Sequence, residues 1–198
     1  MKHLSLIAFA VVCTTSFATQ AQQNSEPHRV GAQLNAGGAS YKSSKQDGDG
    51  VMSLYLYYNY QFNETWALEI GLNGGTEIDD WNCKELNNKK FICDRNDELL
   101  FGIGADELNY NNLVVATKGQ FQLTKNSYLY GKIGGQYYDY EIAKNNSKIL
   151  NQDGLGMFAE GGWQYDWDNG FAFNAGIQYL TMGDLDISSL NVGMSYRF

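Results

Sequence analysis

Apolar and polar residues alternate with a period of two over most of the chain. This pattern is typical of strands that have one apolar and one polar face. It predicts eight strands, at residues 29–41, 51–62, 65–76, 112–123, 127–141, 154–165, 170–181 and 185–198. Within 65–76, for example, Trp66, Leu68 and Ile70 share one face, while Glu69 and Asn73 lie on the other. The sequence therefore predicts an all-β fold.

The connections between these strands differ in length. Three are very short, at residues 63–64, 124–126 and 166–169. The others are generally longer and polar, and the longest covers 77–111. Short and long connections are expected to alternate strictly, which puts tight turns at one rim and loops at the other. That asymmetry is typical of outer-membrane barrels, which have short periplasmic turns and longer external loops.

Charged residues are few within the predicted strands. Five of them, of both signs, lie on the polar faces: Glu69, Lys118, Lys132, Glu160 and Arg197. A soluble, lipocalin-like barrel is the main alternative, but its polar face would meet water and would need more charges for solubility. Five charges of both signs fit a narrow polar lumen better, where they pair with one another. Because eight strands leave an interior that side chains fill, we interpret these residues as a structural network that plugs the barrel, not as an ion path.

Aromatic residues cluster around the short turns and the end of the chain. The cluster contains Tyr60, Phe62, Trp66, Phe121, Tyr165, Trp167, Phe171, Phe173, Tyr196 and Phe198. A packed core would also use aromatic residues, but it would not sort them to one rim. An interfacial girdle at the periplasmic side of a membrane explains the sorting. Tyr41, Tyr137 and Tyr179 are candidates for the opposite girdle.

The first 21 residues have the layout of a secretory signal peptide. Lys2 and His3 precede an apolar run at 4–12, and small residues follow it. We expect cleavage after Ala21, which leaves a barrel domain at 22–198. The mean hydropathy of −0.40 is that of a soluble protein, but hydropathy averages do not detect membrane strands. The net charge of −8 and the absence of a basic stripe argue against nucleic-acid binding.

Loop 77–111 contains the two cysteines that remain after cleavage, Cys83 and Cys93. In an exported protein we expect them to form a disulfide that closes a short loop. The loop is then an ordered projection, such as a hairpin beyond the membrane. Its candidate contact residues are Trp81, Lys84, Lys89, Lys90 and Phe91. A variable shield without a single ligand is the alternative interpretation of this loop.

The sequence does not predict catalysis, a metal site or a cofactor. After cleavage the one remaining histidine is His28, in the lead-in to the first strand, where we expect it to be a solvated bystander. No Ser–His–acid arrangement can be built on the barrel without it. The segment at 46–50 (QDGDG) begins like a calcium loop, but Val51 occupies a ligand position. We therefore expect a polar turn there.

The end of the chain resembles the C-terminal signal that the barrel-assembly machinery recognises. Gly193, Tyr196 and Phe198 match that signal, and Val192 stands where a polar residue is usual. With the segments TKGQFQL and LYGKIGGQYY, the chain resembles the small outer-membrane barrels of Gram-negative bacteria, a group that includes the OmpA transmembrane domain, OmpX and accessory-colonisation-factor-like barrels. The resemblance implies an eight-stranded antiparallel up-and-down transmembrane β-barrel in the outer membrane. It also implies that Lys118 and Lys132 pair with Glu69 and Glu160.

The predicted function is that of a non-enzymatic outer-membrane barrel with a structural or adhesion-like contact role through its external loops. Its expected partners are outer-membrane lipid, lipopolysaccharide and the barrel-assembly machinery. The sequence identifies no host or cell-surface ligand. The alternative function is a narrow channel for small solutes.

Overall fold

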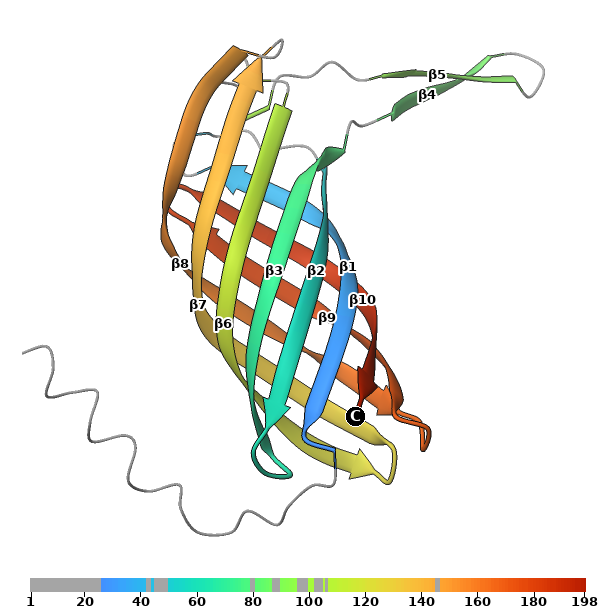
Figure 1. Cartoon of the computed structure of the whole chain (residues 1–198). Helices are drawn as coiled ribbons and strands as arrows, with labels where there is room; N and C mark the ends of the chain where they lie inside the picture. The colour runs from blue at the N-terminus through green and yellow to red at the C-terminus, as the bar shows by residue number, and fades with distance from the viewer. Residues whose placement is uncertain are drawn as a thin grey trace, which may run out of the picture.

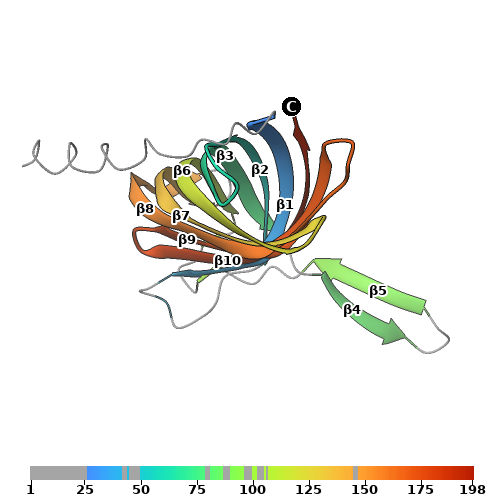
Figure 2. The ribbon, with the colours of Figure 1, turned by 90° about the horizontal axis from the view of Figure 1, so that it is seen from below.

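The computed structural model describes residues 26–41, 44, 50–78, 81–86, 90–95, 100–101, 105, 107–144 and 147–198. The predicted signal peptide lies outside these residues. Eight antiparallel strands form a closed barrel (Figures 1 and 2). They are β1 (His28–Tyr41), β2 (Gly50–Gln61), β3 (Trp66–Ile78), β6 (Glu107–Thr124), β7 (Ser127–Lys144), β8 (Ser147–Asp166), β9 (Phe171–Met182) and β10 (Leu185–Arg197). The predicted up-and-down barrel is confirmed.

The first and last strands of the barrel pair with each other. Their register runs without interruption from Arg29 opposite Arg197 to Tyr41 opposite Leu185. Every barrel strand therefore has two neighbours, in the order β1-β10-β9-β8-β7-β6-β3-β2. Closure matters because an unpaired strand edge inside a bilayer would leave backbone groups without hydrogen-bond partners.

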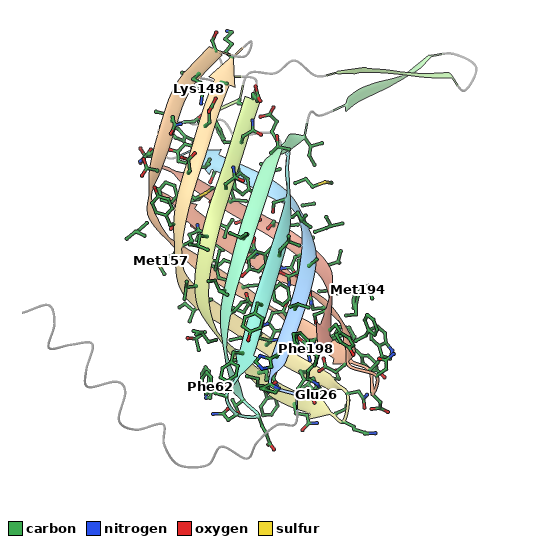
Figure 3. All side chains as sticks on the ribbon, in the orientation of Figure 1. Glu26, Phe62, Lys148, Met157, Met194 and Phe198 are labelled. Carbon is green, nitrogen blue, oxygen red and sulfur yellow. The ribbon has the colours of Figure 1, made fainter. Side chains whose placement is uncertain are left out.

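The outer surface of the barrel is apolar. Exposed side chains follow alternate positions of each strand, and Met157 and Met194 point away from the barrel (Figure 3). The aromatic residues at the tight turns, among them Trp66, Phe121 and Phe198, are exposed as well. A soluble barrel would show the reverse arrangement, with its apolar face inside. Among the residues described, no helix is long and apolar enough to cross a membrane.

The prediction that short and long connections alternate strictly is wrong at two external connections. Strands β7 and β8 continue well beyond their predicted ends, so only residues 145–146 separate them. Residues 183–184 alone join β9 to β10, and Gly183 takes a positive φ of 66° that permits so tight a turn. The polar stretch read as a β7–β8 loop pairs as a tall hairpin because the inward Tyr138, Tyr140 and Ile142 supply it with a buried face.

Loop 77–111 contains a second, two-stranded sheet that is separate from the barrel (Figure 1). It consists of β4 (Trp81–Leu86) and β5 (Lys90–Arg95), which pair as an antiparallel hairpin. The expected hairpin in this loop is therefore confirmed.

Candidate functional site

An ion cluster fills the middle of the lumen. The Lys132 ammonium lies 3.0 Å from a Glu69 carboxylate oxygen and 3.1 Å from one of Glu160. Glu69 is 0% exposed and Lys132 only 5%. The three residues come from β3, β7 and β8, and Lys132 stands directly opposite Glu160 in the register. One cation thus bridges two carboxylates across the barrel interior.

Neutral donors add hydrogen bonds to these carboxylates. The Tyr55 hydroxyl donates to Glu69 over 2.6 Å, and the Tyr130 hydroxyl donates to Glu160 over 2.8 Å. The Gln33 amide donates to the same Glu160 oxygen over 2.9 Å. Hydrogen bonds of this kind help a buried ion pair to keep its charge, so the arrangement fits a structural role.

Glycines on neighbouring strands make room for the inward tyrosine rings. A Cβ added at Gly71 would lie 2.4 Å from the Tyr55 ring, and one at Gly31 would lie 2.3 Å from the Tyr57 ring. The ammonium of Lys132 lies 4.5 Å from the centre of the Tyr57 ring, close enough for a cation–π contact. Tyrosine, glycine and the ion cluster therefore pack as one unit.

Among the described residues, no ion pair joins Lys118 to a carboxylate, so the pairing with Glu69 or Glu160 that the family resemblance implied for it is wrong. Its ammonium donates instead to the amide oxygen of Gln164 over 2.6 Å. Glu69 stands opposite Ala116, two residues along β6 from Lys118. Lys118 itself stands directly opposite Lys132, and Lys132 is the cation that reaches both carboxylates.

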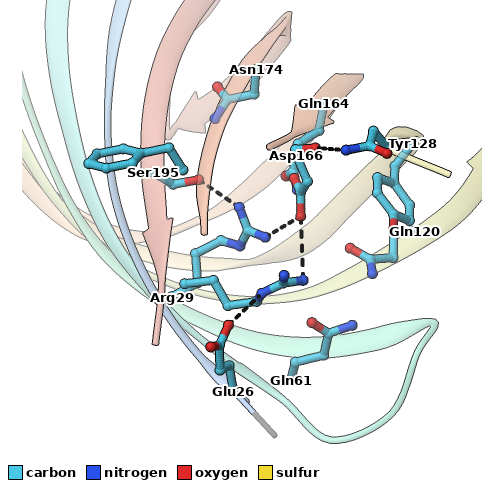
Figure 4. A network of polar contacts seen from close by, with 12 residues as sticks. Glu26, Arg29, Gln61, Gln120, Tyr128, Gln164, Asp166, Asn174 and Ser195 are labelled. Atoms are coloured by element: carbon cyan, nitrogen blue, oxygen red, sulfur yellow. Dashed lines mark hydrogen bonds and ion pairs between the residues drawn. The ribbon is translucent and has the colours of Figure 1, made fainter. Parts of the chain in front are cut away.

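Arg197 lies at the periplasmic end of the lumen. Its side chain is 33% exposed and bonds Glu26 over 3.3 Å, with Asp166 at 3.7 Å. The interior position next to it belongs to Arg29, which bonds Asp166 over 2.5 Å and donates to Ser195 over 2.9 Å (Figure 4). Arg197 therefore lies apart from the Lys132 cluster, but it shares Asp166 with Arg29 in the polar interior near the periplasmic rim, as predicted.

Two charged residues at this rim, Arg29 and Asp166, were not assigned to the interior from the sequence. Arg29 shares the strand parity of Gln33 and Asn35, which was a usable signal for an inward side chain. Asp166 ends β8 and was read as part of a turn. Counting both, three cations and three carboxylates are buried among the residues that the structure describes. They are Arg29, Lys118, Lys132, Glu69, Glu160 and Asp166.

The external end of the lumen is apolar, which corrects the prediction of a polar lumen along its whole length. Phe101 is 2% exposed and belongs to a buried cluster with Leu100 and Ala105. Leu100 and Ala105 form an isolated bridge, so this part of loop 77–111 folds back on itself. The other members are inward residues of the strands, among them Tyr110, Tyr138, Phe158, Leu180, Met182, Leu185 and Ile187. We call this set the external cap.

His28 is part of the barrel and not a solvated bystander, so that expectation was wrong. It begins β1, and its Nδ1 lies 2.7 Å from the Tyr58 hydroxyl. Its ring stacks on Phe198 at 5.6 Å between centroids. The backbones of His28 and Phe198 also exchange two hydrogen bonds, of 3.2 and 2.9 Å. His28 therefore joins the two ends of the closing sheet.

Of the residues of the predicted assembly signal, Gly193 and Tyr196 lie in β10 and Phe198 directly follows it. A Cβ at Gly193 would approach the Ala32 carbonyl oxygen to 2.5 Å, so β1 passes too close for a side chain there. Tyr196 packs on Phe171 with 5.0 Å between ring centroids. These contacts explain which structural role the three residues have in the folded barrel. Their recognition by the assembly machinery stays a prediction.

Comparison with known proteins identifies the fold's family. Residues 9–198 match the family model described as the outer membrane protein beta-barrel domain. The chain belongs to this family. Its place is accordingly the bacterial outer membrane, where the apolar outer face meets lipid. No curated protein sequence matches the chain.

Solved structures of small outer-membrane barrels have similar folds. Neisserial surface protein A is 13% identical with a TM-score of 0.64, over 87% of this chain and 97% of that one. Ail, the attachment invasion locus protein of Yersinia pestis, is 14% identical with a TM-score of 0.56, over 86% and 97%. OprG from Pseudomonas aeruginosa is 16% identical with a TM-score of 0.53, over 87% and 96%. At these identities the likeness concerns the fold alone.

The external face of this outer-membrane barrel carries the tall β7–β8 hairpin and the separate β4–β5 hairpin. On the first, Lys148 pairs with Glu141, and this hydrogen bond raises the pKa of the lysine. On the second, Cys83 stands opposite Cys93. Directly opposed residues of antiparallel strands have Cα atoms about 4.5–5.5 Å apart, within the range that a disulfide spans. The disulfide itself stays a prediction.

The side chains of the predicted contact residues lie outside the described part of the structure. Trp81, Lys84, Lys90 and Phe91 belong to β4 and β5, and the whole of Lys89 lies outside the described part as well. Within the described residues, no group of three or more His, Cys, Asp or Glu residues has an arrangement that could hold a metal ion.

Proposed function

We propose that this protein is a non-enzymatic, non-conducting outer-membrane barrel that presents the β4–β5 hairpin for contact with a polyanionic surface. The observation that carries the proposal is that the barrel lumen is filled, while one hairpin forms a separate sheet outside it. Buried ion pairs and the external cap occupy the lumen, whereas the β4–β5 hairpin is a separate sheet outside the barrel.

The charge of the β4–β5 hairpin supports a polyanion as its partner. The hairpin segment at 81–95 holds four basic residues and two acidic ones, in a chain with a net charge of −8. A locally basic projection on an acidic protein concentrates attraction to anions at one place. Ail, which has a similar fold, was solved in complex with the heparin analogue sucrose octasulfate, and this suggests heparin as a first probe.

The test measures attachment of cells that display the protein to heparin-coated wells. We expect replacement of Lys84, Lys89 and Lys90 with serine to reduce attachment, with a larger loss at low salt because exposed charges are screened. The matched control replaces Lys144 and Lys148, on the β7–β8 hairpin, with serine. Equal attachment by both variants and the unmodified protein would contradict the proposal.

The alternative, a narrow channel, has its own measurement. The refolded protein is inserted into planar bilayers, and current is recorded at fixed voltage. We expect no discrete openings, because Lys132 and its two carboxylates occupy the lumen beneath the external cap. Regular single-channel steps would favour the channel and refute a non-conducting barrel.

A further inference from the structure

A groove interrupts the lipid-facing surface of the barrel in its external half. It has a volume of about 530 Å³ and crosses four neighbouring strands, β2, β3, β6 and β7. The side chains that line it point outward. They are Leu54, Leu56, Leu72, Asn111, Leu113, Tyr137 and Asp139, with Gly74 between them. Its volume lies within the range of about 300–1,000 Å³ that is typical of small-ligand sites.

The strand register explains how the groove arises. One row of cross-strand partners runs Leu56, Leu72, Leu113 and Tyr137. The next row toward the outside runs Leu54, Gly74, Asn111 and Asp139. Because the second row has no side chain at Gly74, a notch opens between Leu54 and Asn111. A Cβ at Gly74 would meet a single atom within 4 Å, the Asn111 amide oxygen at 3.1 Å.

Polarity changes along the second row. Leu54 is an exposed apolar residue, whereas Asn111, Asp139 and the next partner, Asp153, are exposed and polar. The Tyr137 hydroxyl donates to Asp153 over 2.9 Å, as expected of an aromatic residue at a membrane interface. The row therefore leads from hydrocarbon at Leu54 to the polar boundary at Asp139.

We propose that this groove binds one acyl chain of an outer-leaflet glycolipid of the lipid A type, with the chain across Gly74 and its amide and hydroxyl groups at Asn111 and Asp139. The groove faces lipid and lies in the external half, so its occupant comes from the outer leaflet. The carboxylate of Asp139 accepts hydrogen bonds, so amide and hydroxyl donors next to an acyl chain fit this end of the groove. The phosphates of lipid A lie on the sugar rings, away from these linkages, and the ammonium of phosphatidylethanolamine is the competing donor.

Native mass spectrometry of the refolded full-length protein tests the proposal. The probes are lipid A, phosphatidylethanolamine and phosphatidylglycerol, supplied together in equal amounts. We expect the lipid A adduct to dominate for the unmodified protein and to fall about tenfold in Gly74→Leu, because the new side chain fills the notch. Asp139→Leu, which removes the acceptor, is expected to abolish the preference for lipid A.

The matched control is Gly131→Leu, another substitution on the lipid face, where an added Cβ meets nothing within 4 Å. We expect it to retain lipid A as the unmodified protein does. Electrophoretic mobility without heating verifies that each variant is folded. Equal retention by Gly74→Leu and Gly131→Leu, or a preference for either phospholipid, would overturn the assignment. The outcome is independent of the role proposed for the β4–β5 hairpin.

Discussion

Replacement of Lys132 with methionine removes the one cation shared by two buried carboxylates. In the native protein its ammonium lies 3.0 Å from Glu69 and 3.1 Å from Glu160. Methionine keeps much of the length and volume of the side chain, so the change acts mainly on charge. Loss of one partner from a buried ion pair typically costs about 3–5 kcal/mol, because the other charge remains buried and uncompensated.

We therefore expect Lys132→Met to lower the free energy of unfolding by about 3–5 kcal/mol. Because two carboxylates are affected, the upper part of that range is the better expectation. Removing one of them should recover part of the loss, so Lys132→Met/Glu69→Gln should be more stable than Lys132→Met alone. The coupling measured by such a double-mutant cycle separates the ion pair from other effects of each substitution.

Urea unfolding in lipid vesicles, followed by tryptophan fluorescence and by gel mobility without heating, measures these differences. Lys125→Met is the matched control, since Lys125 pairs with Asp168 at 3.6 Å and both side chains are exposed. Surface pairs of this kind contribute about 0–1 kcal/mol. A loss below about 1 kcal/mol for Lys132→Met, or no recovery in the double variant, would refute a central structural role for the cluster.

Four further outcomes follow from the same structure. Gly71→Ala should lose about 1–3 kcal/mol of unfolding free energy through overpacking, while Gly131→Ala, on the open lipid face, should change it little; urea unfolding compares them. His28→Ala should lose about 1 kcal/mol and refold more slowly into vesicles, because it removes a hydrogen bond and a ring contact at the barrel seam. Phe101→Ala should speed protease cleavage of loop 77–111 in the folded protein without shifting the urea midpoint of the barrel. For the protein purified from the outer membrane, maleimide should label Cys83 only after reduction; labelling without reduction would disprove the disulfide.

The alternation along each strand was enough to predict the barrel and to tell its two faces apart. In a strand, each side chain's direction follows from its position in the chain, so the lipid-facing Leu68 and the inward Glu69 could be assigned from neighbours alone. The same local logic assigned Lys132 and Glu160 to the interior. It would also have assigned Arg29, had the parity been followed to the start of the first strand.

Which inward residues meet was decided by the tertiary structure. Alternation gives the direction in which each side chain points, but not its position along the barrel axis. That position depends on the register between the strands of the closed sheet. The register puts both Lys118 and Glu160 directly opposite Lys132, yet it is the ammonium of Lys132 that reaches Glu69 and Glu160. Closure of the barrel likewise brings Arg29 to Asp166, 137 positions further along the chain.

The external cap depends on a contact that no local pattern records. Phe101 lies in a loop whose sequence reads as a polar projection, yet it packs against inward residues of the strands. The inward apolar residues at the external ends of β9 and β10, Leu180, Met182, Leu185 and Ile187, are buried in the same cluster as Phe101. Periodicity therefore determined the fold and the two faces of the barrel, while register, closure and the return of one loop determined what fills it.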